Sequence, residues 1–487
     1  MHLRLFAIFI ALAGTSWSAT GHPLPASVRQ ALALARVPPD ALSVVISSIP
    51  ATSTLSTQPL AGAVLPPRLQ HRADIQRNPA SVMKLVTTYA ALDTLGADFT
   101  WKNRVYTDGF VGHNGNPGVL EGNLILRGSG DPKLVLERIQ DLFAQVQASG
   151  VREVRGDIVL DRSVFDVPNT NPADFDDEPL RPYNVLPDGF LLNFKSLIFS
   201  FTPDEARGRA IVRSEPPIAG VDIPAEVPLA KGVCADWKGR LHADFFTPVK
   251  IHFGGGYAAS CGERVWPVAY SDPHSYAVRV VEAMWHQSGG KLSGQVRMGT
   301  TPRNARLLLT AESLPLADII ADVNKFSNNV MAQQVFLTLS AQNRQGSFSA
   351  TQRVVTAWWK KNFSGHALPV LENGSGLSRK ERASASALTA LLHHAGTSAN
   401  AQVFTNSLGI AGVDGTAARM KERNAASQAI GRAFLKTGTL KDVAAIAGYV
   451  NAASGQRYSI VAIINHANAG AARGALDALV EWTVQDQ

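Results

Sequence analysis

The stretch AFLKTGTLKDVAAIAGYVNAASGQRYSIVAIIN, residues 433–465, decides the fold class of this 487-residue chain. It holds three strand-like runs, at 433–440, 443–451 and 456–465, and Ala453-Ser454-Gly455 is the clearest of the short polar turns between them. Strands joined by such short links must be antiparallel. The amphipathic stretch 471–484 then predicts a helix that lies on this sheet.

The beginning of the chain complements this C-terminal sheet. Residues 25–36 indicate a short helix and residues 42–49 a β-branched strand. These elements together predict one α/β (α+β) domain, an antiparallel sheet flanked by helices on both faces.

The middle of the chain has a different character. From about residue 100 to about 300 it is rich in Gly, Pro and Asp turns, with short strand-like runs such as 122–127 and 156–160. Helical periodicity is sparse there and returns at 276–287, before long helical patterns at 317–339 and 385–394. We therefore expect a domain split into residues 20–98 and 303–487 by a β-rich insertion at 99–302.

Composition narrows the classes of partner. Lys and Arg total 46 against 39 Asp and Glu, so a net charge of +7 is spread over the whole chain. No block of Lys or Arg marks a nucleic-acid tail, which argues against nucleic-acid binding. With 45% apolar and 17% charged residues, the chain has enough apolar sequence for large cores.

The N-terminus predicts export. Arg4 precedes an apolar run from Leu5 to Ala13, and small residues follow at 16–19, which is the order of a secretory signal peptide at 1–19. The alternative is a buried N-terminal helix. The run is far shorter than the roughly 20 residues of a transmembrane helix, and no later stretch predicts a membrane anchor. In an exported chain, Cys234 and Cys261 favour a disulfide and make a poor metal site, so we expect neither metal nor cofactor.

A second informative stretch is NPASVMKLVTTYAAL, residues 78–92. Asn78 is a good helix N-cap and Pro79 suits the first helical position. Ser81 and Lys84 then lie three residues apart on one face of the first turn. A serine hydroxyl becomes a nucleophile when a base takes its proton, and a lysine amine can do so if burial and nearby cations lower its pKa. The helix N-terminus also supplies free N–H groups that favour a developing oxyanion.

Ser-x-x-Lys is a weak signal by itself, because it recurs at 288–291 in a glycine-containing turn. The ordinary alternative for Ser81 and Lys84 is a solvated first turn. A second motif, Lys436-Thr437-Gly438-Thr439, strengthens the case, because it places a cation, two hydroxyls and a glycine that permits close substrate approach on one strand. Its alternative is an edge strand with a solvated lysine.

The third motif is Ser327-Asn328-Asn329, at the start of a helix that ends near Leu339. Its alternative is plain helix capping, and Ser398-Ala399-Asn400 is a competing match. We prefer Ser327, because Ser398 follows a helix end that leads into a loop.

Ser-x-x-Lys, Ser-x-Asn and Lys-Thr-Gly in this order are the signature of penicillin-binding proteins and β-lactamases. Beyond the motifs, the chain resembles the D-alanyl-D-alanine carboxypeptidase/endopeptidase family known as class C low-molecular-mass penicillin-binding proteins, peptidase family S13. Asn328 and Asn373 stand where the family usually has Asp, and residues 183–193 follow it only loosely. The matching stretches are 122–132, 156–161, 374–379 and 412–416.

The resemblance implies a split β-lactamase/transpeptidase-like domain with two small domains inserted after the serine helix. It implies a periplasmic enzyme that cuts peptidoglycan peptides through an acyl-enzyme and reacts covalently with β-lactam antibiotics. In the implied roles, Ser81 is the acylated nucleophile, Lys84 is its base, and Ser327 relays a proton to the leaving amine.

The remaining implied roles concern binding. Asn329 would hold the substrate amide, and Lys436 with Thr437 would bind the terminal carboxylate. Backbone N–H groups of the nucleophile and of Thr439 would form the oxyanion hole, and Gly438 would lie against the substrate between them.

Two alternatives share these motifs. A class A β-lactamase needs a deacylating glutamate between the second and third motifs, and the near-match Glu178-Pro179-Leu180-Arg181 precedes Ser327 instead. A non-catalytic cell-wall or β-lactam binding protein is the other alternative. The sequence leaves open whether the enzyme trims terminal D-alanine, cuts cross-links or does both.

Overall fold

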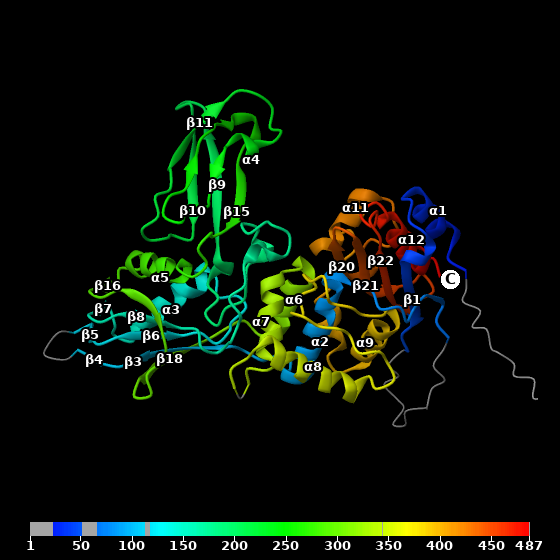
Figure 1. The fold of residues 1–487 in the computed structure, drawn as a ribbon, viewed down its shortest axis with the longest axis horizontal. Coiled ribbons are helices and arrows are strands. Elements are labelled where there is room, and N and C mark those ends of the chain that lie inside the picture. The colour runs from blue at the N-terminus through cyan, green and yellow to red at the C-terminus, as the bar shows by residue number, and fades with distance from the viewer. Residues whose placement is uncertain (1–22, 51–65, 113–116, 343, 487) are drawn as a thin grey trace, which may run out of the picture.

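The structure is a computed structural model that describes residues 23–50, 66–112, 117–342 and 344–486 (Figure 1). The predicted signal segment at 1–19 lies outside the described residues. Within these ranges no helix is long and apolar enough to cross a membrane.

A six-stranded antiparallel sheet joins the two ends of the chain, in the order β19-β20-β21-β22-β1-β2. The first strand of the chain pairs with the last, from Leu42 opposite Ile464 to Ser48 opposite Tyr458, so the two ends of the chain share one sheet, as the sequence predicted. The strands are β1 (Leu42–Ser48), β2 (Leu69–His71), β19 (Gly409–Ile410), β20 (Ala433–Leu440), β21 (Val443–Asn451) and β22 (Arg457–Asn465).

Helices cover both faces of this sheet, which confirms the predicted fold class (Figure 1). On β22, Ile460, Ala462 and Ile464 face one apolar core, whereas Val461 and Ile463 face the other. Burial on both faces explains the continuous apolar run of this strand. The first core contains α1 (Ala26–Leu34) and α12 (Arg473–Val484). The second contains α2 (Lys84–Leu95), α6 (Leu316–Phe326), α7 (Asn329–Thr338), α8 (Phe348–Asn362), α9 (Ala385–Thr397) and α10 (Ala401–Asn406), and α11 (Arg419–Arg423) precedes β20.

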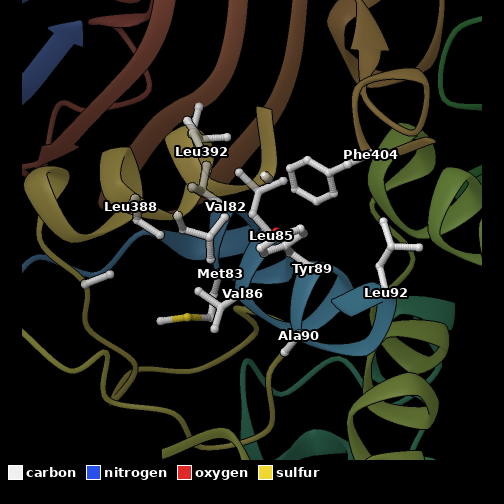
Figure 2. Close-up of a cluster of buried hydrophobic side chains, with 14 of the residues drawn as sticks. Val82, Met83, Leu85, Val86, Tyr89, Ala90, Leu92, Leu388, Leu392 and Phe404 are labelled. Atoms are coloured by element: carbon white, nitrogen blue, oxygen red, sulfur yellow. The ribbon is translucent and has the colours of Figure 1, made fainter. Parts of the chain in front are cut away.

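Helix α2 is the centre of the second core. All its residues from Lys84 to Leu92 are buried, and they pack against Leu388 and Leu392 of α9 and Phe404 of α10 (Figure 2). A helix that is apolar on all sides needs such an enclosed position. The packing fixes the end of α2 that carries the Ser-x-x-Lys motif.

The middle of the chain forms two further lobes. The lower lobe comprises residues 102–161 and 276–312, with sheets in the order β17-β8-β6-β3-β18 and β16-β7-β5-β4 (Figure 1). Its elements are β3 (Lys102–Thr107), β4 (Phe110–Val111), β5 (Val119–Glu121), β6 (Leu124–Arg127), α3 (Leu136–Ala148), β7 (Glu153–Val154), β8 (Ile158–Asp161), α5 (Tyr276–Gln287), β16 (Lys291–Leu292), β17 (Val296–Gly299) and β18 (Arg306–Glu312).

The upper lobe, residues 196–269, projects from the lower lobe in Figure 1, and the two lobes share one apolar core. Its main sheet has the order β14-β11-β10-β9-β15, and a disulfide joins Cys234 to Cys261. Its elements are β9 (Ser196–Asp204), β10 (Arg209–Glu215), β11 (Glu226–Ala230), α4 (Trp237–Arg240), β12 (Ala243–Asp244), β13 (His252–Phe253), β14 (Tyr257–Ala258) and β15 (Arg264–Ala269).

The structure differs from the sequence expectations in three places. Helix α3 lies within the stretch where we expected few helices, and it buries Ile139, Leu142, Phe143 and Val146 at helical spacing. Strand β18 pairs with β3, so the sheet of the lower lobe extends past the expected boundary at residue 302. The helical pattern 317–339 is broken at Ser327, whose backbone is left-handed with φ 60°.

Candidate active site

The Ser-x-x-Lys segment begins with a tight turn. Asn78 is held by the side chain of Asn465, and its own Oδ1 accepts the N–H of Ala80 at 2.9 Å. Ala80 has a φ of 49°, so the chain is left-handed just before Ser81. The helix therefore starts with a 3₁₀ turn, η2 (Ala80–Met83), rather than at Pro79 as we expected. Buried non-glycine residues in this conformation cluster at functional sites.

Two glycines let other segments press against this turn. A Cβ on Gly438 of β20 would lie 2.5 Å from the carbonyl oxygen of Pro79. A Cβ on Gly376, whose φ is +80°, would lie 2.0 Å from the carbonyl oxygen of Ala80. Because only glycine fits both positions, η2 is clamped between β20 and the 374–376 loop.

Lys84 is completely buried directly below Ser81. Its Nζ lies 3.0 Å from Ser81 Oγ and 2.6 Å from Asn329 Oδ1, and it donates to the carbonyl oxygen of Ser375. Burial and the nearby Lys436 hold the pKa of Lys84 well below its usual range, while Glu381 acts in the opposite direction. A lysine with such a pKa can be a neutral amine that accepts the serine proton.

Glu381 is a buried carboxylate that organises the loop beside Lys84. Its two oxygens accept backbone N–H groups, Oε1 those of residues 372–374 and Oε2 that of Gly376. Burial raises the pKa of Glu381, and these hydrogen bonds act against that rise. The loop carries the Ser375 carbonyl that contacts Lys84, so Glu381 positions this contact.

Lys436 and its neighbours approach the serine from β20. Lys436 is buried, and burial lowers its pKa to about 7. Thr437 Oγ1 lies 2.7 Å from Thr416 Oγ1. Strand β19 pairs only with residues 434 and 435 of β20, so among the described strands none covers the edge at 436–440.

A cavity of about 250 Å³ opens over this edge. Ser81, Ser327, Thr437, Gly438 and Thr439 all line it, so the structure brings the three sequence motifs to one place.

The Ser-x-Asn motif reaches the site through a helix break. Ser327 ends α6 in a left-handed conformation, and its hydroxyl makes no hydrogen bond with Ser81 or Lys84 in the described part of the chain. Asn329 begins α7 and uses both ends of its amide, because Nδ2 donates to the carbonyl oxygen of Tyr183 at 3.0 Å while Oδ1 accepts from Lys84.

Similarity to known proteins identifies the family of the chain. The model of the D-Ala-D-Ala carboxypeptidase 3 (S13) family matches residues 62–486. The chain belongs to this family. The S13 protein is 25% identical to D-alanyl-D-alanine carboxypeptidase DacB of Haemophilus influenzae, over 80% of this chain and 81% of that protein. It is 29% identical to a D-alanyl-D-alanine carboxypeptidase of Actinomadura sp., over 81% of this chain and 74% of that protein.

The fold of the S13 protein also matches a solved structure. The crystal structure of penicillin binding protein 4 (dacB) from Haemophilus influenzae aligns with a TM-score of 0.72 at 20% sequence identity, over 93% of this chain and 99% of that one. The β-lactamase/transpeptidase-like fold that the resemblance implied is therefore confirmed.

The competing sequence matches lie outside the cavity of the S13 protein. Ser288 caps the end of α5 in the lower lobe, where its hydroxyl donates to the carbonyl oxygen of Trp285 at 2.7 Å. Ser398 ends α9, and its hydroxyl donates to the carbonyl oxygen of Ala395. Neither lines the cavity that contains Ser81.

Several residues of the site carried no usable signal in the sequence. Arg419 and Arg473 line the cavity and add positive charge to it, and Arg473 donates to Thr439 Oγ1 at 3.4 Å. Glu381 acts through hydrogen bonds with the nearby loop 372–376, and Tyr183 acts through a contact with Asn329, which is distant in the sequence. A single arginine or glutamate has no pattern, so spacing could not have identified these residues.

Proposed function

We propose that this S13 protein is a periplasmic serine D-alanyl-D-alanine carboxypeptidase or endopeptidase that acts on peptidoglycan peptides through an acyl-enzyme on Ser81. The observation that carries the proposal is the 3.0 Å contact between Lys84 Nζ and Ser81 Oγ, with a lysine pKa that favours the neutral amine. The names of the curated relatives support the choice of substrate.

In the first step Lys84 takes the proton of Ser81, and Oγ attacks the carbonyl carbon of the scissile amide. The backbone N–H groups of Ser81 and Thr439 are our candidates for the oxyanion hole. The C–N bond then breaks and the leaving amine accepts a proton, for which the Ser327 hydroxyl is our candidate relay. Water next attacks the ester and restores the serine.

Recognition of the substrate follows from the open edge of β20. An extended peptide can align there and place its terminal carboxylate between Lys436 and Thr437. Asn329 Nδ2 already donates to the Tyr183 carbonyl. To hold a substrate amide, Asn329 Nδ2 would have to donate to the substrate as well as to the Tyr183 carbonyl, or to the substrate in place of that carbonyl.

The same arrangement predicts inhibition by penicillin. A β-lactam presents a strained amide beside a carboxylate, so Lys436 and Thr437 would dock the carboxylate while Ser81 opens the ring. The opened ring remains attached, and the ester persists unless a base activates water. Penicillin binding protein 4 from Haemophilus influenzae, which has the same fold, has been crystallised in complex with a β-lactam.

The carboxylates near the site argue against a β-lactamase. Asp477 lines the cavity, but both of its oxygens accept hydrogen bonds from Arg423. Both oxygens of Glu381 already accept backbone N–H groups, so this buried carboxylate is unsuited to activating water. Glu178 is exposed and pairs with Arg181 at 3.3 Å. We therefore expect slow release of the acyl group and little turnover of nitrocefin.

Labelling with fluorescent penicillin tests the proposal. Ser81→Ala should abolish the covalent label, and Lys84→Ala should slow labelling by at least about 100-fold, because each 1.36 kcal/mol added to the barrier costs about tenfold. Ser288→Ala and Ser398→Ala are matched controls that should label normally. A label on Ser81→Ala protein, or an adduct that mass spectrometry places on another serine, would show that the assignment is wrong.

Mass spectrometry of products then separates the activities. Monomeric muropeptides that lose D-alanine indicate a carboxypeptidase, and cross-linked muropeptides that separate into monomers indicate an endopeptidase. Absence of both products from protein that labels with penicillin would favour the non-catalytic binding protein.

A further inference from the structure

A second cavity lies between the lower lobe and the loop that follows α7. Its volume is about 480 Å³, and the side chains that line it include Lys102, Arg104, Arg127 and Arg344 but no Asp or Glu. Helix α7 spans ten residues between the active-site Asn329 and this loop. At 1.5 Å per residue the cavity is thus about 15 Å from the site.

The sheet register concentrates positive charge in this cavity. Arg104 of β3 lies directly opposite Arg127 of β6, and Lys102 lies two residues from Arg104 on the same face. Like charges that face each other across two strands destabilise a sheet. The repulsion between Arg104 and Arg127 therefore raises the free energy of the folded protein, and a bound anion would reduce this repulsion.

The neighbouring carboxylates compensate only part of this charge. Arg127 is 3.9 Å from Asp161, whose oxygens already accept hydrogen bonds from Ser163 and Thr301. Lys102 is 3.7 Å from Glu312, and both side chains are about half exposed.

Two cations are left without a counterion. Among the described residues, Arg104 and Arg344 have no ion-pair partner. Both are exposed and open into the cavity.

We propose that this cavity binds carboxylate or phosphate groups of an anionic cell-wall polymer and so holds the polymer while its peptide is cut at Ser81. Arginine suits such groups, because its planar guanidinium donates two parallel hydrogen bonds to one oxyanion. Several cations in one cavity suit a polymer that carries several anions. The choice of polymer rests on the proposed function, whereas the preference for an anion rests on the cavity alone.

Retention on purified peptidoglycan sacculi, measured by co-sedimentation at low ionic strength, tests the inference. We expect Arg104→Gln/Arg127→Gln to raise the dissociation constant at least about fivefold. The control Arg303→Gln/Arg353→Gln removes the same charge from exposed positions outside the cavity and should change it less than about twofold. Equal losses in both variants, or no loss in the first, would overturn the proposal.

Two further measurements show whether weaker retention reflects the loss of anion binding or damage to the fold or to the active site. The melting temperature of the single variant Arg104→Gln should equal or exceed that of the wild type, because the like-charge pair is removed while the contact between Arg127 and Asp161 is kept. A reduced melting temperature would contradict the unfavourable pairing on which the inference depends. Hydrolysis of a short peptide that ends in D-alanyl-D-alanine should be unchanged in the double variant. If the wild-type protein cuts neither that peptide nor cross-linked muropeptides, the proposed function is wrong, and the retention ratio still decides the inference.

Competition identifies the group that is bound. At matched ionic strength, displacement by poly-L-glutamate indicates carboxylate and displacement by inorganic phosphate indicates phosphate, and either result supports the site. If both displace the protein no better than chloride does, the cavity has no preference for these oxyanions and the proposal fails.

Discussion

At the scale of single residues, the buried Lys84 is influenced by a second buried lysine and by a buried carboxylate. Burial lowers the pKa of both Lys84 and Lys436, and for Lys84 the charge of Lys436 adds to the effect. Glu381 is the counter-charge that acts on Lys84. The charge of Lys436 adds to burial in lowering the pKa of Lys84, whereas burial alone lowers that of Lys436, so we expect a neutral Lys84 as base and a protonated Lys436 for the substrate carboxylate.

This assignment predicts a falling alkaline limb in the pH profile. Lys436, with a pKa of about 7 in the free enzyme, loses its charge as the pH rises through that value. Lys84 must be neutral to act, so its ionisation sets the acidic limb. We expect kcat/KM for a peptide with a free C-terminal carboxylate to be bell-shaped and to fall about tenfold per pH unit above the upper pKa.

The control is a substrate whose terminal carboxylate is replaced by an amide. The kcat/KM of this amide substrate should be lower, but its pH profile should lack the alkaline limb, because an uncharged terminus makes no ion pair that the deprotonation of Lys436 could remove. If the limb persists with the amide, the group that titrates is not the one that binds the carboxylate.

At the scale of elements, the site depends on the close fit of β20 and the 374–376 loop against η2. Gly376→Ala is the sharpest test, because the new Cβ would meet Ala80 O at 2.0 Å and φ is +80°. We expect a loss of about 1–3 kcal/mol in the free energy of unfolding. We also expect penicillin acylation to slow about 100-fold, because an ångström of misplacement can cost that much.

Gly365→Ala provides the matched control for this substitution. Its Cβ meets nothing within 4 Å and its φ is not in the left-handed range, so stability and acylation should stay close to those of the wild type. Normal acylation in Gly376→Ala would mean that the loop does not fix the geometry of Ser81 and Lys84.

At the scale of the whole molecule, the upper lobe is separate from the core that holds the serine. The disulfide closes a stretch with a sequence separation of 27 residues inside this lobe. The chain-entropy model gives about 3–4 kcal/mol for such a loop. Cys234→Ser/Cys261→Ser should therefore lower the unfolding temperature of the upper lobe, as measured by calorimetry and hydrogen exchange, while penicillin labelling is retained below that temperature.

Two outcomes would contradict this prediction. If the purified wild-type protein alkylates at both cysteines under non-reducing denaturation, the disulfide is absent in solution. If labelling is lost while the lobe is still folded, the upper lobe is coupled to the active site.

The sequence alone determined the four long strands of the main sheet and the three motifs, whereas it gave no sign of the short strands β2 and β19. Residues 433–465 predict three strands because their turns are local, and strands linked by short turns have to pair. The family resemblance covered most of the chain, and the family model confirms it. Helix α3 was also encoded in the sequence, in the spacing of Ile139, Leu142, Phe143 and Val146, but the turn-rich surroundings led us to overlook it.

Only the tertiary structure decided which distant groups meet. Lys84 contacts Asn329 and Ser375, which are 245 and 291 residues away, and Asn329 contacts Tyr183 of the intervening segment. The facing pair Arg104 and Arg127 likewise follows from strand register. Such contacts depend on long-range packing. The same packing buries Lys84 and Lys436 and so lowers their pKa values. Patterns in the sequence report only on residues that are neighbours along the chain, so they could not show these contacts.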